Sequence, residues 1–254
     1  MKKSDLKSFL DEKAHRYENP EFLTSDPIQV PHQFSKKEDI EIMAFLTASI
    51  AWGNRKSIIN SAQKMLALME GNPYDFICQH QEKDRQRCEG FVHRTFNGED
   101  LAYFMKALQF IYTQKGGLET VFTPHNNEET LHMVIHQFRS LFFSLSPPKR
   151  IKKHIADPLK GSAAKRLNMF LRWMVRPSHK GVDFGLWHQI KTSQLSCPLD
   201  VHSGNVARAL GMLKRKQNDH KAVVLLDTFL RKLDSNDPVK YDFALFGLGV
   251  FEKF

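Results

Sequence analysis

Apolar side chains recur along this chain with the spacing of α-helices from one end to the other. Over residues 4–17, Leu6, Leu10 and Ala14 alternate with charged positions, and residues 98–112 repeat the same three- and four-residue spacing. The two-residue alternation that marks half-buried strands is nearly absent. The pattern therefore predicts an all-α protein.

Helix starts along the chain are marked by short polar residues that can cap a helix. Ser35 and Glu38 have the spacing of a capping box before a helix over residues 40–52. That helix is apolar on nearly all sides, so we expect it to be buried at the centre of its lobe. Further N-caps are expected at Asn54, Asn97 and Asp237.

One stretch, residues 157–213, combines residue types that suggest chemistry. Gly161 and the small residues after it form a tight turn into a helix that starts near Ala164. Backbone N–H groups at such a start, with the positive end of the helix dipole, can bind a phosphate. Lys165 lies in this helix and carries a nucleophilic amine, and Asp200 has the position of an N-cap of a second helix.

Charge concentrates next to this stretch. The 254 residues, enough for one large or two small domains, carry 37 Lys and Arg against 28 Asp and Glu, a net charge of +9. Residues 149–176 hold nine basic residues and one acid, Asp157. Such a balance is typical of a protein that binds a polyanion, although a solvated basic face that only aids solubility gives the same pattern.

Several classes of site and location are disfavoured by the sequence. Cys78, Cys88 and Cys197 show no CxxC spacing, which argues against structural zinc, an iron–sulfur cluster and a disulfide framework. His132 and His136 have metal-ligand spacing but no third ligand nearby. We expect no metal and no cofactor. Without an apolar run long enough for a membrane span or signal peptide, we expect a cytoplasmic protein.

The order of motifs resembles a known superfamily. The chain reads DPLKGSAAKRLNMFLRWMVR, then a polar insert, then CPLDVHSGNVARALGML. A glycine turn followed by a lysine, then a Pro-Leu-Asp-Val-His segment, resembles the helix-hairpin-helix DNA glycosylases, which include endonuclease III and the 8-oxoguanine glycosylases. The whole sequence resembles still more closely a bacterial family of unknown function attached to that superfamily. The resemblance implies a two-lobed fold with a central cleft, with a barrel lobe and hairpin over 36–175 and a second lobe from 1–35 and 176–254.

The resemblance also implies roles for single residues. Lys165 would attack the sugar carbon of a flipped nucleotide, and Asp200 would stabilise the oxocarbenium-like state or move protons. The segment LTASIAWGNRKSI resembles the helix whose end supplies the base pocket, which implies Trp52, Gly53 and Asn54 there, while His202 would position the Asp200 loop. Phosphate contacts are expected from Arg55, Lys149, Arg150, Lys152, Lys153, Lys160, Gly161, Ser162, Arg166 and Arg208.

The implied function is base-excision repair. We expect a nucleoid-associated monomer that binds duplex DNA with a damaged base or an abasic site, cleaves the N-glycosidic bond, and has AP lyase activity through a Schiff base. Two alternatives stay open: a nucleosidase or RNA-directed enzyme on the same scaffold, and a non-catalytic nucleic-acid binder.

Two features differ from the family pattern, and three of the site residues admit a structural explanation. The second hairpin glycine is Ala163 here, and Asp200 follows Lys165 by 35 residues. The insert RPSHKGVDFGLWHQIKTSQLSC is expected either to form a small helix around 183–190 or to reshape the pocket. Asp200 as a helix cap, Trp52 as a core residue and Arg208 as an ion-pair partner are the corresponding structural alternatives.

Overall fold

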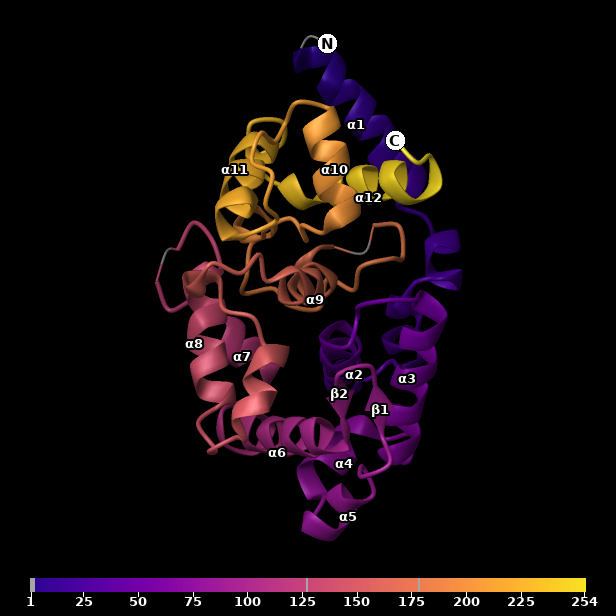
Figure 1. Ribbon diagram of the computed structural model, residues 1–254, viewed down its shortest axis with the longest axis vertical. Helices are drawn as coiled ribbons and strands as arrows, with labels where there is room; N and C mark the ends of the chain where they lie inside the picture. Colours follow the sequence, from indigo (N-terminus) through magenta and orange to yellow (C-terminus); the bar gives the residue numbers. More distant parts are fainter. Residues whose placement is uncertain (1–2, 127, 178) are drawn as a thin grey trace. The chain divides into compact units, whose positions relative to one another are not determined.

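The computed structural model describes residues 3–126, 128–177 and 179–254, and the chain is mostly helical over these ranges (Figure 1). A two-stranded antiparallel hairpin pairs β1 (Val92–His93) with β2 (Phe96–Asn97). The helical class predicted from the hydrophobic spacing is confirmed, and the short hairpin is a feature that this spacing did not indicate. The α-helices are α1 (Lys3–Tyr17), α2 (Lys37–Ser49), α3 (Arg55–Leu68), α4 (Pro73–Gln79), α5 (Glu82–Gln86), α6 (Gly98–Gln114), α7 (Leu118–Phe122), α8 (His132–Phe142), α9 (Lys165–Val175), α10 (Val201–Ala209), α11 (His220–Arg231) and α12 (Tyr241–Phe251).

The described residues form two compact units. Unit 1 comprises those of 1–22, 124–133 and 157–254, and unit 2 comprises 23–123 and 134–156. Unit 1 contains α1 and α9 to α12, whereas unit 2 contains α2 to α7, most of α8 and the hairpin. The units differ from the expected lobes at three segments, 23–35, 124–133 and 157–175.

The core of unit 2 is built around α2. Phe45 of α2 is fully buried and packs against Phe104 of α6 and Phe138 of α8, with ring centroids 5.9 and 5.6 Å apart. Ile42, like Phe45, has no exposed surface, so α2 buries side chains on nearly every face. The prediction of a central buried helix is confirmed, because a helix without a polar face is stable only when neighbours cover all of it.

Two of the three caps expected in this unit form. Asn54 accepts a hydrogen bond from the Ser57 N–H (3.2 Å), and Asn97 makes a capping box with Asp100 at the start of α6. The cap expected at Ser35 is wrong, since α2 begins after Lys36 without a side-chain cap. Its first turn is tied to α4 instead, where Asp39 accepts from the Tyr74 N–H (2.8 Å).

Unit 1 is organised around α12, which lies against α1 and α10 (Figure 1). Apolar residues of these helices and of α11, among them Leu10, Val206, Leu226 and Leu245, are buried together. The glycines of α12 permit the close packing. A side chain at Gly247 would overlap the ring of Tyr17 in α1, and a Cβ at Gly249 would lie 3.1 Å from the Cβ of His202 in α10. The sequence FGLGVF therefore encodes two helix contacts.

Buried ion pairs join the far end of α9 to the rest of unit 1. Arg172 pairs with Asp183 (3.2 Å) and Asp242, and Arg176 pairs with Asp183 (3.2 Å) among other carboxylates. Glu18 and Asp237 complete the set around Arg176. Two guanidinium groups thus serve four carboxylates in a region largely closed to water, which makes the network sensitive to the loss of either arginine.

The insert between Lys165 and Asp200 runs without a helix over residues 183–190. The Phe184 and Trp187 N–H groups donate to the Trp173 and Met174 carbonyls at the end of α9 (2.8 and 3.0 Å). Trp187 is buried and packs edge-on against Phe170. Of the two alternatives for this insert, the small helix is wrong, because the segment uses its backbone to satisfy the last carbonyls of α9, and the reshaped pocket stays a prediction.

Candidate functional site

The turn before Lys165 is held by local hydrogen bonds. Asp157 caps a 3-10 turn by accepting from the Leu159 N–H (3.1 Å), and Gly161 adopts a left-handed conformation with φ of 89°. Ala164 is also left-handed, with φ of 47°, which costs an alanine about 1 kcal/mol. The helix then starts at Lys165 without a side-chain cap. Lys165 is thus the first residue of α9.

Asp200 caps α10 as predicted. Its Oδ1 accepts from the Ser203 N–H (3.0 Å), and the Ser203 hydroxyl in turn accepts from the Asp200 N–H (2.9 Å), which completes a capping box. The second carboxylate oxygen, Oδ2, lies 3.9 Å from the Lys165 Nζ. Capping therefore occupies one oxygen of Asp200 and leaves the other facing the lysine amine.

The Lys165–Asp200 pair belongs to unit 1 and is accessible from solvent. The two side chains are 28% and 24% exposed, so water or a substrate can reach the amine and the carboxylate. Both residues lie at the starts of helices, where backbone N–H groups are not used by the helix itself. An amine nucleophile beside a carboxylate that can accept its proton is an arrangement capable of covalent chemistry at an electrophilic carbon.

A third residue, Asp242 of α12, connects the two segments that carry this pair. Its carboxylate accepts from Arg172, two turns after Lys165 in α9, and its Oδ1 lies 3.8 Å from the Sγ of Cys197, three residues before Asp200. Burial raises the pKa of Asp242 to about 6, Arg172 and Lys165 lower it, and Asp200 raises it. The sequence signal that could have found it is a lone carboxylate in an otherwise apolar helix.

The residues expected in the base pocket belong to both units. Trp52 is half-buried in unit 2, where its indole stacks on His154 and meets His93 edge-on (centroids 6.0 and 5.4 Å apart). The side-chain oxygen of Asn54 caps α3. His202 is an exposed residue of α10 in unit 1. The packing of the half-buried indole on two histidines agrees with the structural alternative for Trp52, and its role in a base pocket stays a prediction.

The hairpin residues His93 and Arg94, to which no local sequence pattern gives a role, contact residues near Trp52 and Gly53. Gly53 has φ of 99°, and a side chain there would overlap the Arg94 guanidinium. His93, in β1 of the hairpin, forms a hydrogen bond through its Nδ1 with Ser61 Oγ of α3 (2.9 Å). The other ring nitrogen of His93 lies 3.4 Å from the Trp52 carbonyl oxygen, so the hairpin contacts the segment between α2 and α3 and, through Ser61, α3 itself.

The basic residues expected to contact phosphates differ in exposure and in whether they already bind other residues of the chain. Lys149, Lys152, Lys153 and Lys160 are exposed. Arg150 instead binds within unit 2, to Asn97 Oδ1 (2.6 Å), the Thr95 carbonyl (3.2 Å) and Asp100 (3.1 Å). This engagement favours a structural role for Arg150.

The remaining basic candidates are partly buried. Arg55 and Arg166 are each half-buried, and burial lowers the pKa of Arg166 to about 10. Arg208 donates to the Arg215 carbonyl (2.7 Å) and to Asn218 Oδ1 (2.5 Å), so neither of these partners is the carboxylate expected for an ion pair. Gly161 is exposed and Ser162 is half-buried in the turn before α9.

A groove of about 1010 Å³ lies elsewhere in unit 1, and its lining comes from residues 124, 126, 128–130 and 132, from 189–194 and from 224–235. His132 at its wall bonds through Nε2 to Ser196 Oγ (2.9 Å), and burial lowers the pKa of His132 to about 4. Asp227 is buried there and accepts from the Cys197 N–H (3.0 Å), and burial raises its pKa to about 6. Local sequence patterns did not indicate this groove, because its walls come from three separate segments.

The raised pKa of Asp227 leads to a stability prediction. Between pH ~4 and ~6 the folded protein binds a proton at Asp227 that the unfolded chain has released, so stability falls as pH rises through this window. Asp227→Asn removes this dependence, and the variant should gain up to about 3 kcal/mol relative to wild type between pH ~4 and ~7. Urea unfolding at several pH values measures the gain. Parallel stability curves for the two proteins would contradict it.

The family described as "Protein of unknown function (DUF2400)" matches residues 26–251. No curated protein and no solved structure matches the chain. In the described ranges, no helix is both long and apolar enough to cross a membrane. The family match spans residues of both units, including Lys165, Asp200 and Asp242.

Proposed function

This chain belongs to the DUF2400 family, and we propose that it is a DNA base-excision glycosylase of the helix-hairpin-helix type. The observation that carries the proposal is the Lys165–Asp200 pair, whose amine and carboxylate lie 3.9 Å apart at two helix starts and are open to solvent. The mostly helical chain supports the fold-level part of the proposal. The excess of basic residues supports DNA as the substrate.

In the proposed reaction, Lys165 in its neutral form attacks C1′ of the target nucleotide. A C1′–Nζ bond forms, the N-glycosidic bond breaks, and the base leaves with the bonding electron pair and takes up a proton. Asp200 accepts the proton that the attacking amine gives up, through the oxygen not used for capping. The C1′–O4′ bond then breaks as O4′ takes up a proton, which gives a protonated Schiff base between Lys165 and C1′. Loss of a proton from C2′ expels the 3′ phosphate and cleaves the strand by β-elimination.

The buried network gives Lys165 a fixed position in this proposal. Arg172 lies seven residues after Lys165, on the same face of α9, and its bond to Asp242 anchors that face to α12. Asp242 also contacts Cys197, in the segment that leads to Asp200. A rigid connection between the two helix starts is what a lysine needs in order to meet a sugar carbon at bonding distance.

Borohydride trapping tests the proposal. The full chain is incubated with duplexes that contain an abasic site or 8-oxoguanine, with an undamaged duplex as control. Borohydride adds hydride to the imine carbon and converts the Schiff base into a stable amine, so a covalent protein–DNA band is expected on the abasic duplex. No band on either damaged duplex, together with no base release from the 8-oxoguanine duplex, would overturn the lyase mechanism. DNA binding without chemistry would favour the non-catalytic binder.

Asp200→Asn separates catalysis from helix capping. Asparagine caps helices about as well as aspartate, so the free energy of unfolding should change by less than about 0.5 kcal/mol. Because the amide cannot accept a proton, base release should fall by about 10²- to 10⁴-fold. Asp200→Ala is the matched comparison and should lose about 1 kcal/mol of stability as well. Full activity in Asp200→Asn would leave Asp200 a structural cap alone.

A further inference from the structure

The segment that follows α10, residues 211–219, is a firmly anchored loop of unit 1. Gly211 turns the chain with φ of 73°, and the N–H groups of Met212 and Leu213 both donate to the Ala207 carbonyl (2.8 and 3.2 Å). Met212 and Leu213 are buried in the unit 1 core. These two buried side chains therefore fix the position of the surface residues that follow them.

The same loop is hydrogen-bonded to the segment that carries Asp200. Arg208 donates to the Arg215 carbonyl (2.7 Å) and to Asn218 Oδ1 (2.5 Å), and Asn218 donates to the Asp200 carbonyl (2.8 Å). Gly204 makes room for this contact, since a Cβ there would lie 2.7 Å from Asn218 Oδ1. Arg208 and Asn218 thus couple the position of the loop to the start of α10.

The far end of the loop contacts the turn before Lys165. The His220 N–H donates to the Gly161 carbonyl (3.0 Å), and Ser162 forms an isolated antiparallel bridge with Asp219. Residues 211–219 therefore touch both segments of the candidate site, one through Asn218 and the other through Asp219, and the adjoining His220 of α11 adds a bond to the second segment. Neither contact is visible in the sequence, where the loop follows Lys165 by more than forty residues.

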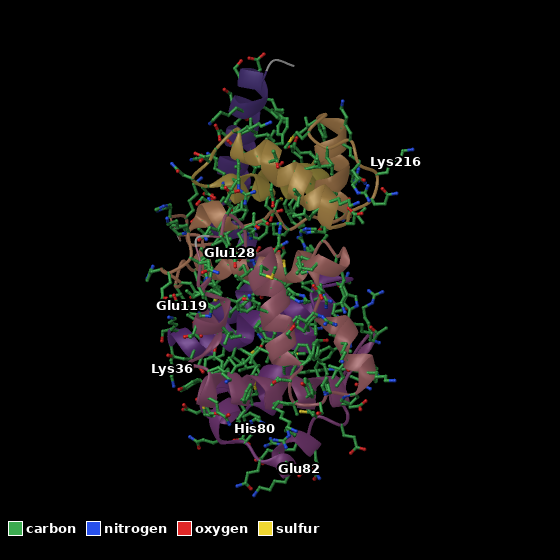
Figure 2. All side chains as sticks on the ribbon, turned by 90° about the vertical axis from the view of Figure 1, so that its left-hand side faces the viewer. Lys36, His80, Glu82, Glu119, Glu128 and Lys216 are labelled. Atoms are coloured by element: carbon green, nitrogen blue, oxygen red, sulfur yellow. The ribbon has the colours of Figure 1, made fainter. Side chains whose placement is uncertain are left out.

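The exposed charge of this region is positive. Lys214, Lys216 and Lys221 are exposed, and Figure 2 shows Lys216 pointing away from the ribbon. The acid among them, Asp219, is paired with Arg215 (Nε to Oδ1 2.7 Å). Residues 200–221 contain one other acid, Asp200, which caps α10.

We propose that Lys214, Lys216 and Lys221 form a phosphate-binding surface that holds the backbone of duplex DNA beside the Lys165–Asp200 site. Lysines that only aid solubility do not need a fixed position, whereas this loop is hydrogen-bonded to both segments of the site. Lys214 and Lys216 lie on this loop and Lys221 in the first turn of α11. Lysines held in this way displace condensed counterions from DNA, which supplies affinity without base specificity. The choice of DNA rests on the proposed function, but binding itself does not require the chemistry.

The test compares the triple variant Lys214→Gln, Lys216→Gln, Lys221→Gln with wild type. Affinity for an undamaged DNA duplex is measured over a range of salt concentrations, with an RNA duplex of the same sequence as a second arm. Removing one lysine–phosphate pair should lower the slope of log K against log salt by about 0.9, so the slope of the triple variant should be smaller by about 2 to 3. The matched control is Lys64→Gln, Lys83→Gln, Lys106→Gln, which removes three exposed lysines of unit 2 and should leave the slope near wild type.

The outcomes separate this surface from the proposed reaction. Equal slopes in the two triple variants would overturn the surface, as would tight binding of the RNA duplex without binding of the DNA duplex. A lowered slope with neither a trapped adduct nor base release in wild type would keep the surface and refute the glycosylase. If both hold, Lys165→Ala should keep the wild-type slope, and the triple variant should still form the adduct when the DNA is in excess.

Discussion

Lys165→Ala is expected to abolish the borohydride-trapped adduct and to lower base release by roughly 10³-fold or more. Alanine has no amine with which to form a bond to C1′, so no imine is available for reduction. Lys165 lies at the first position of α9, and alanine is the best helix former, so the helix should still begin there. The loss should therefore appear in chemistry and not in folding, as measured by trapping gels and by thermal melting of the same samples.

Lys165→Arg is the sharper companion variant. It keeps a positive charge facing Asp200 but has no primary amine, and its guanidinium stays protonated. If Lys165 acts as a nucleophile, the arginine variant should be as inactive as the alanine variant. If Lys165 acts only through its charge, the arginine variant should retain activity. Lys106→Ala, at an exposed position of α6 in unit 2, serves as the control that should react like wild type.

Arg176→Ala is expected to destabilise unit 1 by about 3–5 kcal/mol, the cost of leaving buried charges without their partner. Arg176 is 5% exposed and donates to Glu18, to Asp183 (3.2 Å) and to Asp237 (2.9 Å). Its removal leaves these carboxylates facing one another in a region of low dielectric. Urea unfolding at pH 7 measures the loss.

The pH dependence of that loss identifies its cause. Burial raises the pKa of Asp183 and of Asp237, so these groups take up protons readily once the guanidinium is gone. The destabilisation should therefore shrink as the pH is lowered toward 5. Arg16→Ala is the control, because Arg16 is 63% exposed and lies 3.8 Å from Glu252, and it should change stability by less than about 0.5 kcal/mol. A pH-independent loss in Arg176→Ala would point to packing instead of charge.

Local sequence relations predicted those parts of the fold that depend on neighbours three or four residues apart. The caps at Asn54, Asn97 and Asp200 were correct because a capping side chain bonds to a backbone N–H within the next turn. The cap at Ser35 was wrong because α2 takes its fixed start from a contact with α4, formed by Asp39 and Tyr74, which lie 35 residues apart. Helix starts are thus predictable only where no tertiary contact replaces the cap.

The insert before Asp200 shows the same limit. DFGLWHQI has the apolar content of a short helix, but its backbone bonds to the carbonyls at the end of α9. A segment of this length gains little from forming its own helix, because nucleation costs more than the few bonds it returns. The end of a neighbouring helix offered unsatisfied acceptors, and those acceptors decided the conformation.

The sequence by itself determined the helical class, the basic character, and the two residues, Lys165 and Asp200, on which the functional proposal depends. Only the tertiary structure decided that Lys165 and Asp200 meet, that Asp242 lies between their segments, and that residues 211–219 touch both. Periodicity and capping act within a few residues along the chain. Ion pairs such as Arg176 with Glu18 join residues 158 positions apart, and their formation depends on the whole packed core of unit 1.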